Sequence, residues 1–234
     1  MRAMTDAECA AIAAQIENDG HAVVRGVIDP ETLRRAQRIV QDRVAANDGK
    51  YTQFSGPEGL REFLGADFSE LPEFRALFER VCRGVTQPQA PGTPLVQFVR
   101  AFTGKDDADH ALDFHFDSSV LTMLIPVLLP TGASAGNLLL APNFRPIRKT
   151  YAANALDKAI YCNPLAQMIF RRLYRRRSPV IRHVALTPGD LYLFSGYRTL
   201  HSNESCEPDQ IRSTAVFQFG NPHKRSWKGA PAPV

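Results

Sequence analysis

The chain has 234 residues, of which 44% are hydrophobic and 22% charged, and this composition excludes a predominantly disordered protein. No apolar run reaches the roughly 18–20 residues that a membrane-spanning helix needs, and the acidic first twenty residues do not fit a signal peptide. The four cysteines are scattered without a CxxC pair, so we expect reduced thiols in a cytoplasmic protein.

The net charge of +4 is unevenly distributed along the chain. Residues 143–183 hold ten Lys or Arg and one acid, Asp157, which gives a charge of +9. The rest of the chain has 18 basic and 23 acidic residues, a charge of −5. Helical spacing places Arg172 and Arg176 in one row of this segment. The segment is either a solvated helix face or a surface for an anionic ligand.

The first third of the chain has the patterns of helices with one strand between them. Thr5 and Glu8 form a capping-box pattern, which begins a helix. The predicted elements are a helix from Thr5 to Gly20, a valine-rich strand over 21–28, a helix from Asp29, a loop over 47–59 and a helix over 71–81.

From Leu95 onward the sequence predicts short strands separated by turn residues. They cover residues 95–102, 112–116, 120–129, 137–141, 180–186, 191–194 and 211–219, and a mostly helical basic insertion interrupts them. This order favours a sandwich or a jelly roll with a helical buttress. We expect one domain over 1–234, with mainly helical support over 1–92, a jelly-roll core over 95–220 and the basic insertion over 143–177.

His115 and Asp117 form the first candidate functional pair. Alternate residues of a strand point to the same side, so the imidazole and the carboxylate can converge on one point. A surface histidine near an aspartate is the simpler interpretation of the same pattern. His201, which follows the strand over 191–194, is a second histidine that could join them.

Arg212 lies in a run that is otherwise typical of an apolar strand. A buried guanidinium needs a partner, because an unpaired buried charge is costly. That partner is either one of the nearby acids, Glu204, Glu207 or Asp209, in a structural salt bridge, or the carboxylate of a ligand, which the planar fork of arginine binds through two hydrogen bonds. Thr214 shares the face of Arg212 and can donate a further hydrogen bond.

Two histidines and one carboxylate make the facial triad of non-haem iron enzymes, which leaves open positions on the metal. With this set the chain resembles the Fe(II)/2-oxoglutarate-dependent oxygenases. Residues 115–124 resemble the family's HxD strand, and residues 187–194 resemble the strand that leads to the distal histidine. The eleven-residue step from His201 to Arg212 and the first strand, over 19–27, are similar to the phytanoyl-CoA dioxygenase-like branch.

The resemblance implies an α+β, mainly β fold built on a double-stranded β-helix of the cupin type. It implies that His115, Asp117 and His201 hold Fe(II). It also implies that 2-oxoglutarate and O2 are cosubstrates, and that Arg212 and Thr214 bind the distal carboxylate of 2-oxoglutarate. Thr122 is either a further contact to 2-oxoglutarate or a β-forming residue without such a role.

The expected reaction is hydroxylation of a small, anionic or carrier-linked metabolite, with release of succinate and CO2. The resemblance leaves desaturation and ring formation open, whereas the presence of Asp117 disfavours halogenation. We expect no membrane partner, and the lack of a second arginine in a downstream Asn- and Thr-containing motif argues against nucleic acid. The alternatives are a jelly-roll metalloenzyme that does not use 2-oxoglutarate and a non-enzymatic module that binds anions.

Overall fold

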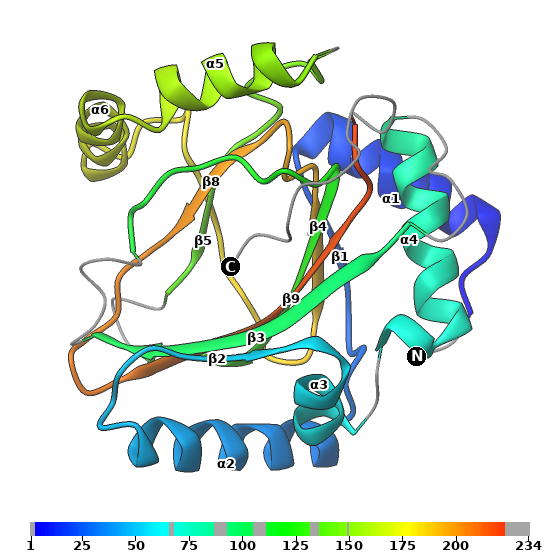
Figure 1. Cartoon of the computed structure of the whole chain (residues 1–234), viewed down its shortest axis with the longest axis vertical. Helices are drawn as coiled ribbons and strands as arrows, with labels where there is room; N and C mark the ends of the chain where they lie inside the picture. Colours follow the sequence, from blue (N-terminus) through cyan, green and yellow to red (C-terminus); the bar gives the residue numbers. More distant parts are fainter. Residues whose placement is uncertain are drawn as a thin grey trace.

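Two antiparallel sheets form the framework of the computed structural model, which describes residues 3–65, 68–86, 93–104, 111–131, 136–148 and 150–222 (Figure 1). The larger sheet has the strand order β1-β7-β4-β9-β3-β2, and the smaller sheet has the order β6-β5-β8. The strands are β1 (Ala22–Val24), β2 (Thr52–Ser55), β3 (Leu95–Thr103), β4 (Leu121–Leu128), β5 (Leu138–Ala141), β6 (Arg182–Val184), β7 (Leu191–Phe194), β8 (Leu200–Asn203) and β9 (Ile211–Phe219).

The helices before β3 pack against the outer face of the larger sheet. They are α1 (Asp6–Asp19), α2 (Pro30–Ala46), α3 (Gly56–Leu64), the 3-10 turn η1 (Phe68–Glu70) and α4 (Pro72–Val85). Phe217 of β9 lies at the centre of this layer, with its ring centre 5.0 Å from that of Phe74 and 5.4 Å from that of Phe68. This apolar layer supports the sheet from behind and leaves its other face for the site.

Strand alternation separates the two faces of the larger sheet. Along β9, Ala215, Phe217 and Phe219 belong to the helix-facing core, whereas the intervening residues face the smaller sheet. In the β3–β9 ladder, Arg100 lies opposite Thr214. The two sheets therefore enclose a space into which charged and polar side chains of β3 and β9 point.

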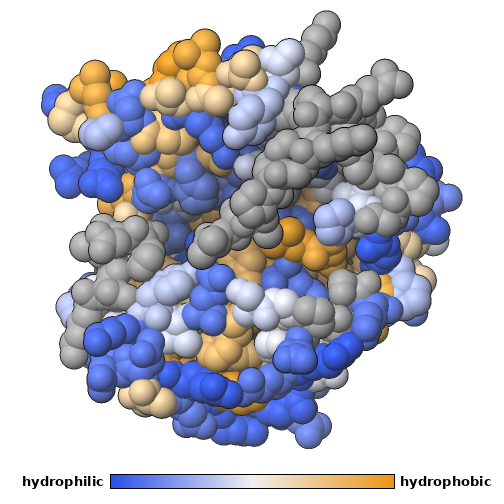
Figure 2. Space-filling view, in the orientation of Figure 1, coloured by the Kyte–Doolittle hydropathy of each residue, from blue (hydrophilic) through white to orange (hydrophobic). Residues whose placement is uncertain are grey.

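Two further helices, α5 (Tyr151–Tyr161) and α6 (Pro164–Arg175), lie on the side of the smaller sheet, away from α2 and α3 (Figure 1). Phe170 of α6 packs against Phe114 at a ring separation of 5.5 Å, and it joins a small core with Leu139 and Leu200 of the smaller sheet. Figure 2 shows apolar side chains on the outer edge of the molecule over α5 and α6. Within the described part of the chain, none of the helices is both long and apolar enough to cross a bilayer.

The structure differs from the sequence-based expectation at residues 47–59, for which a loop was expected. Strand β2 forms at the sheet edge, where Phe54 pairs with Val99 of β3, and α3 follows directly. Leu60 and Phe63 of α3 are fully buried. The turn-forming residues of this stretch obscured both elements, because a four-residue edge strand depends on its neighbour for stability more than on its own composition.

Residues 112–116, for which a strand was expected, form only a single bridge, between His115 and His201. Leu112 has a positive φ of 53°, which interrupts an extended conformation before this point. The expected strand over 180–186 shortens to β6, which pairs with β5 through three residues.

Candidate metal centre

His115, Asp117 and His201 lie together at the space between the sheets, and one ligand atom from each lies within 4.8 Å of the others. His201 Nε2 is 3.5 Å from Asp117 Oδ2, and His115 Nε2 is 4.0 Å from Asp117 Oδ1. Asp117 and His201 are buried, whereas His115 is partly exposed. These separations leave room for one metal ion with bonds of about 2 Å to each residue.

Backbone hydrogen bonds fix where the three side chains originate. His115 and His201 exchange both of their backbone hydrogen bonds, each with an N to O distance of 3.0 Å. The backbone N–H of Asp117 donates to Gly196 O, also at 3.0 Å. The segment 115–117 is thus held between β8 and the turn after β7, so residues far apart in the chain meet at one point.

The hydrogen bonds of the two imidazole rings determine which ring nitrogen faces the shared point. His115 Nδ1 lies 2.9 Å from Asp113 O, and His201 Nδ1 lies 3.0 Å from Thr199 O. A carbonyl oxygen only accepts, so each Nδ1 carries the proton. The lone pair of each Nε2 therefore points toward Asp117 and is available to a metal ion.

The charge states of His201 and Asp117, the two buried residues of the triad, also favour binding of a cation. Burial lowers the pKa of His201 to about 4, and the attraction of Asp117 opposes this shift only in part. Burial alone would raise the pKa of Asp117. The charges of His201 and His115, with the hydroxyl of Thr122, outweigh burial and hold the pKa of Asp117 below its ordinary value. At neutral pH, His201 is neutral and Asp117 is ionised, which is the state in which both bind metals.

The Asp117 carboxylate is held by two neighbours, one of which the sequence did not reveal. The Thr122 hydroxyl, which was considered as a contact for 2-oxoglutarate, donates to Asp117 Oδ2. Gly196 lies against the same carboxylate: a Cβ at this position would lie 2.1 Å from Thr122 Oγ1 and 2.5 Å from Asp117 Oδ2. No side chain fits there without displacing Asp117, so the carboxylate depends on a glycine at this position.

A cavity of about 100 Å³ between the two sheets connects the triad with Arg212. Arg212 is 1% exposed, and its Nε–H donates to Gly136 O at 3.0 Å. The Thr214 hydroxyl is buried next to it on the same face of β9, and it has no hydrogen-bond partner within the described residues. Arg212 lines the cavity together with the three residues of the triad and Thr122, whereas Thr214 lies beside the cavity.

Arg100 is a cavity residue that the sequence analysis missed. It lines the cavity from β3, directly across the ladder from Thr214, and burial lowers its pKa while the charges of Tyr51 and Asp117 oppose this. A charged residue within a predicted strand was only a weak signal here, because the same strand also holds the polar residues Gln97 and Thr103. Asn203 and Gln218, two further polar residues of the cavity wall, gave no comparable signal.

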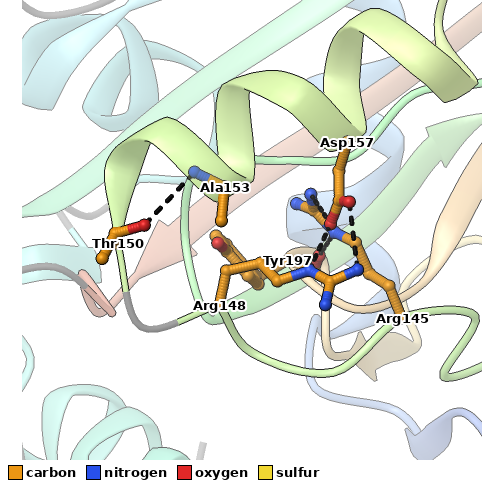
Figure 3. A network of polar contacts seen from close by, with 6 residues as sticks. All are labelled: Arg145, Arg148, Thr150, Ala153, Asp157 and Tyr197. Carbon is orange, nitrogen blue, oxygen red and sulfur yellow. Dashed lines mark hydrogen bonds and ion pairs between the residues drawn. The ribbon is translucent and has the colours of Figure 1, made fainter.

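Part of the basic insertion points inward and supports the site (Figure 3). The Arg145 guanidinium lies 4.0 Å from the ring centre of Phe116, and its Nε–H donates to Tyr197 O at 2.8 Å. Asp157 of α5 accepts from Arg145 at 3.2 Å and from Arg148 at 2.7 and 3.0 Å. These contacts hold α5 and the residue between His115 and Asp117 in place, so not all of the positive charge is available to a ligand.

Solved structures that are similar to this chain identify its fold. No protein-family model matches the chain, and no curated protein does. A prolyl hydroxylase from Trichoplax adhaerens, solved with a hypoxia inducible factor peptide, superposes with a TM-score of 0.59 at 11% identity, over 95% of this chain and 94% of that one. A prolyl-4-hydroxylase from Pseudomonas putida gives a TM-score of 0.52 at 10% identity, over 91% of this chain and 98% of that one.

A third similar structure is the non-heme alpha ketoglutarate dependent epimerase SnoN of nogalamycin biosynthesis. It superposes with a TM-score of 0.53 at 17% identity, over 93% of this chain and 85% of that one. A second structure of SnoN contains Fe3+, alpha ketoglutarate and nogalamycin RO. The prediction of a jelly-roll fold of the kind found in these oxygenases is confirmed.

Proposed function

We propose that this protein is an Fe(II)/2-oxoglutarate-dependent oxygenase of the phytanoyl-CoA dioxygenase-like branch, acting on a small, anionic or carrier-linked metabolite. One observation carries the proposal. Two imidazole Nε2 atoms and a carboxylate converge at a cavity that is also lined by a buried arginine, Arg212. The donors are the three of a facial iron triad, and the guanidinium suits the distal carboxylate of 2-oxoglutarate.

Each residue of this chain has a distinct task in the proposed reaction. His115, Asp117 and His201 bind the iron, which together with 2-oxoglutarate and O2 supplies the oxidising chemistry and yields succinate and CO2. Arg212 and Thr214 bind and orient the distal carboxylate of 2-oxoglutarate. Apolar walls of the cavity, among them Leu124, Phe194 and Val216, limit the access of water to the reacting groups.

The similar structures support the general kind of reaction and leave its type open. They include two prolyl hydroxylases and an epimerase. Hydroxylation of the substrate is therefore part of our proposal. Asp117, by filling the third ligand position, disfavours halogenation but does not distinguish hydroxylation from desaturation or ring formation. The lowered pKa of Asp117 agrees with a ligand that is charged at neutral pH.

Anaerobic titration of the purified chain with Fe(II), followed by 2-oxoglutarate, tests the proposal. We expect stoichiometric Fe(II) binding and then a visible charge-transfer absorption on addition of 2-oxoglutarate. His201→Ala should lose both signals. His183→Ala is the matched control, since His183 Nδ1 contacts Glu204 at 3.0 Å and does not line the cavity. Fe(II) binding without any effect of 2-oxoglutarate would instead identify a metalloenzyme that does not use this cosubstrate.

The reaction itself is measured as succinate released in the presence of candidate substrates. A panel of carboxylates, phosphates and acyl thioesters, each paired with a neutral analogue, should stimulate succinate release when the correct substrate class is present. Formation of a product heavier by one oxygen atom would establish hydroxylation. Undiminished binding of anionic compounds by chelator-treated protein, without any turnover, would favour the non-enzymatic module.

A further inference from the structure

Helix α5 has its polar side chains inside and its apolar side chains outside, which reverses the usual arrangement of a surface helix. Asn154 and Asp157 are 4% and 5% exposed. The outer side consists of the exposed residues Tyr151, Ala152, Ala155, Leu156, Ala159 and Ile160. Tyr151 and Leu156 are 63% and 61% exposed. The outward side of α5 therefore carries no charge at all.

The first two turns of α6 extend this apolar surface. Leu165 and Met168 are 62% and 60% exposed, and Ile169 is 49% exposed. We call the surface formed by Tyr151, Leu156, Ile160, Leu165, Met168 and Ile169 the α5–α6 face. Figure 2 shows its side chains projecting from the outer edge of the molecule. Several large apolar side chains exposed on two neighbouring helices indicate an interaction site.

Basic residues border the α5–α6 face at the end of α6. The side chains of Arg172, Arg175, Arg176 and Arg177 are exposed, and they form no hydrogen bond or ion pair in the part of the chain that the structure describes. Arg145 and Arg148, by contrast, are bound to Asp157. The positive charge that is free to meet a partner therefore lies beside the exposed apolar side chains.

The reversed polarity of α5 follows from the way the helix is held. Asp157 binds two arginines, and Lys158 Nζ donates to Ser118 Oγ at 3.1 Å. These polar contacts anchor α5 to the site, together with Tyr161 at the end of the helix, whose ring packs against those of Phe116 and Phe144. Leu156 and Ile160, on the outward side of α5, stay exposed.

We propose that the α5–α6 face docks this protein on an anionic lipid surface. The apolar side chains would enter the boundary between headgroups and acyl chains, and the four arginines would contact lipid phosphates. Such docking needs no spanning helix, and the lack of such a helix was the ground for expecting no membrane partner. The proposal is independent of the metal centre.

Charge and shape favour a lipid surface over two other partners of the α5–α6 face, a second copy of the chain and a helix of another protein. Two copies of the chain that met through this face would bring two sets of four exposed arginines together. Partner helices bind in apolar grooves, whereas the hollow of about 470 Å³ beside α6 has the polar residues Gln167, Arg171 and Arg175 in its wall. A basic border around projecting apolar side chains is the arrangement of helices that lie in a bilayer interface.

Co-sedimentation with vesicles tests the proposal on the purified full chain without added metal. The vesicles are phosphatidylcholine alone, or phosphatidylcholine with phosphatidylglycerol, at about 0.1 M and about 1 M salt. Ile160→Ser with Leu165→Ser removes two apolar contacts, and Val96→Ser, an exposed apolar position on β3, is the control. Arg172→Gln with Arg176→Gln removes two charges, and Arg34→Gln with Arg38→Gln on α2, at the same spacing, is the control.

We expect the wild type and both controls to sediment with the anionic vesicles at low salt. Each arginine removed should lower the partition coefficient about fivefold, and each apolar side chain removed should lower it on the order of tenfold. Three results would overturn the proposal: no binding of the wild type to anionic vesicles; equal binding of the wild type and the Ile160→Ser, Leu165→Ser variant; or a wild-type dimer, seen by light scattering, that this variant converts to monomer.

Discussion

Both candidate metal-binding histidines are oriented by a carbonyl two residues upstream. His115 Nδ1 contacts Asp113 O, and His201 Nδ1 contacts Thr199 O. The orientation of each ring therefore depends on the neighbouring backbone. Neither imidazole needs a hydrogen bond from its Nδ1 to a further carboxylate to hold its position. Asp117 differs, because its position depends on Thr122 and on the space that Gly196 leaves. Substitutions near Asp117 should disturb the site more than substitutions near either histidine.

The substitution Gly196→Ala tests whether the position of the Asp117 carboxylate depends on the space beside residue 196. The new methyl group would lie 2.5 Å from Asp117 Oδ2, so the carboxylate must move. Substitutions that displace a ligand through its neighbours lower metal affinity about 10- to 100-fold. We expect a loss of this size in calorimetric titration with Fe(II), together with a decrease of about 1–3 kcal/mol in the free energy of unfolding from the added methyl group. Wild-type affinity in this variant would show that Asp117 is not a ligand.

Arg212→Gln tests the proposed role of the buried guanidinium. Loss of one partner from a buried charge pair costs about 3–5 kcal/mol, which corresponds to about two to three and a half decades in affinity. We expect the dissociation constant of 2-oxoglutarate from the metal-loaded protein to rise by this factor while the Fe(II) constant changes little. The argument fails if 2-oxoglutarate binds to the variant as it does to the wild type.

At the scale of elements, an ionic network attaches α5 to the site, in addition to the ring contacts of Tyr161 with Phe116 and Phe144. Asp157 accepts from both Arg145 and Arg148 (Figure 3). The Arg145 guanidinium also lies over the rings of Phe116 and Tyr197. Arg148 and Arg145 together hold the pKa of Asp157 below its ordinary value. The same network therefore positions α5 and the chain segment between two of the candidate metal ligands.

Asp157→Asn should show how much of the structure depends on this network. The variant leaves Arg145, which is 3% exposed, without its charged partner, and such a change costs about 3–5 kcal/mol. We expect this loss in urea unfolding, with faster amide exchange along α5. Glu62→Gln is the matched control, since its ion pair with Arg43 is exposed and should contribute less than about 1 kcal/mol. Similar losses in both variants would contradict the special role of Asp157.

The limits of prediction from sequence are also seen at this scale. Hydrophobic periodicity reports which residues share a helix face, but it does not report which face is buried. In α5 the buried face is polar because Arg145 and Arg148 reach Asp157, and these long-range contacts are not encoded in local periodicity. Strand β2 was missed for a similar reason, because it depends on pairing with β3.

At the scale of the whole molecule, the jelly roll was predictable because its signals repeat. Short runs rich in Val, Leu and Phe, divided by turn residues, recur from Leu95 onward, and these runs indicated the strands. The HxD pattern and the distant His201 were found as separate motifs, and the fold brings them together through the His115–His201 bridge. Arg100 was missed because its role depends on the register of β3 against β9, which the sequence does not specify.

The buried imidazole of His201 makes the stability of the whole metal-free protein depend on pH. Its pKa is lowered by burial to about 4 in the folded protein and is about 6.5 in the unfolded chain. Between these values the unfolded chain binds a proton that the folded protein does not, so the free energy of unfolding falls as pH decreases from 6.5 toward 4. The loss attributable to His201 is at most about 3 kcal/mol.

Urea unfolding of chelator-treated protein between pH 6.5 and pH 4 should show this decrease in the free energy of unfolding. The variant His201→Gln, whose side chain does not titrate, should show a smaller decrease. An equal pH dependence in both proteins would exclude His201 as its cause.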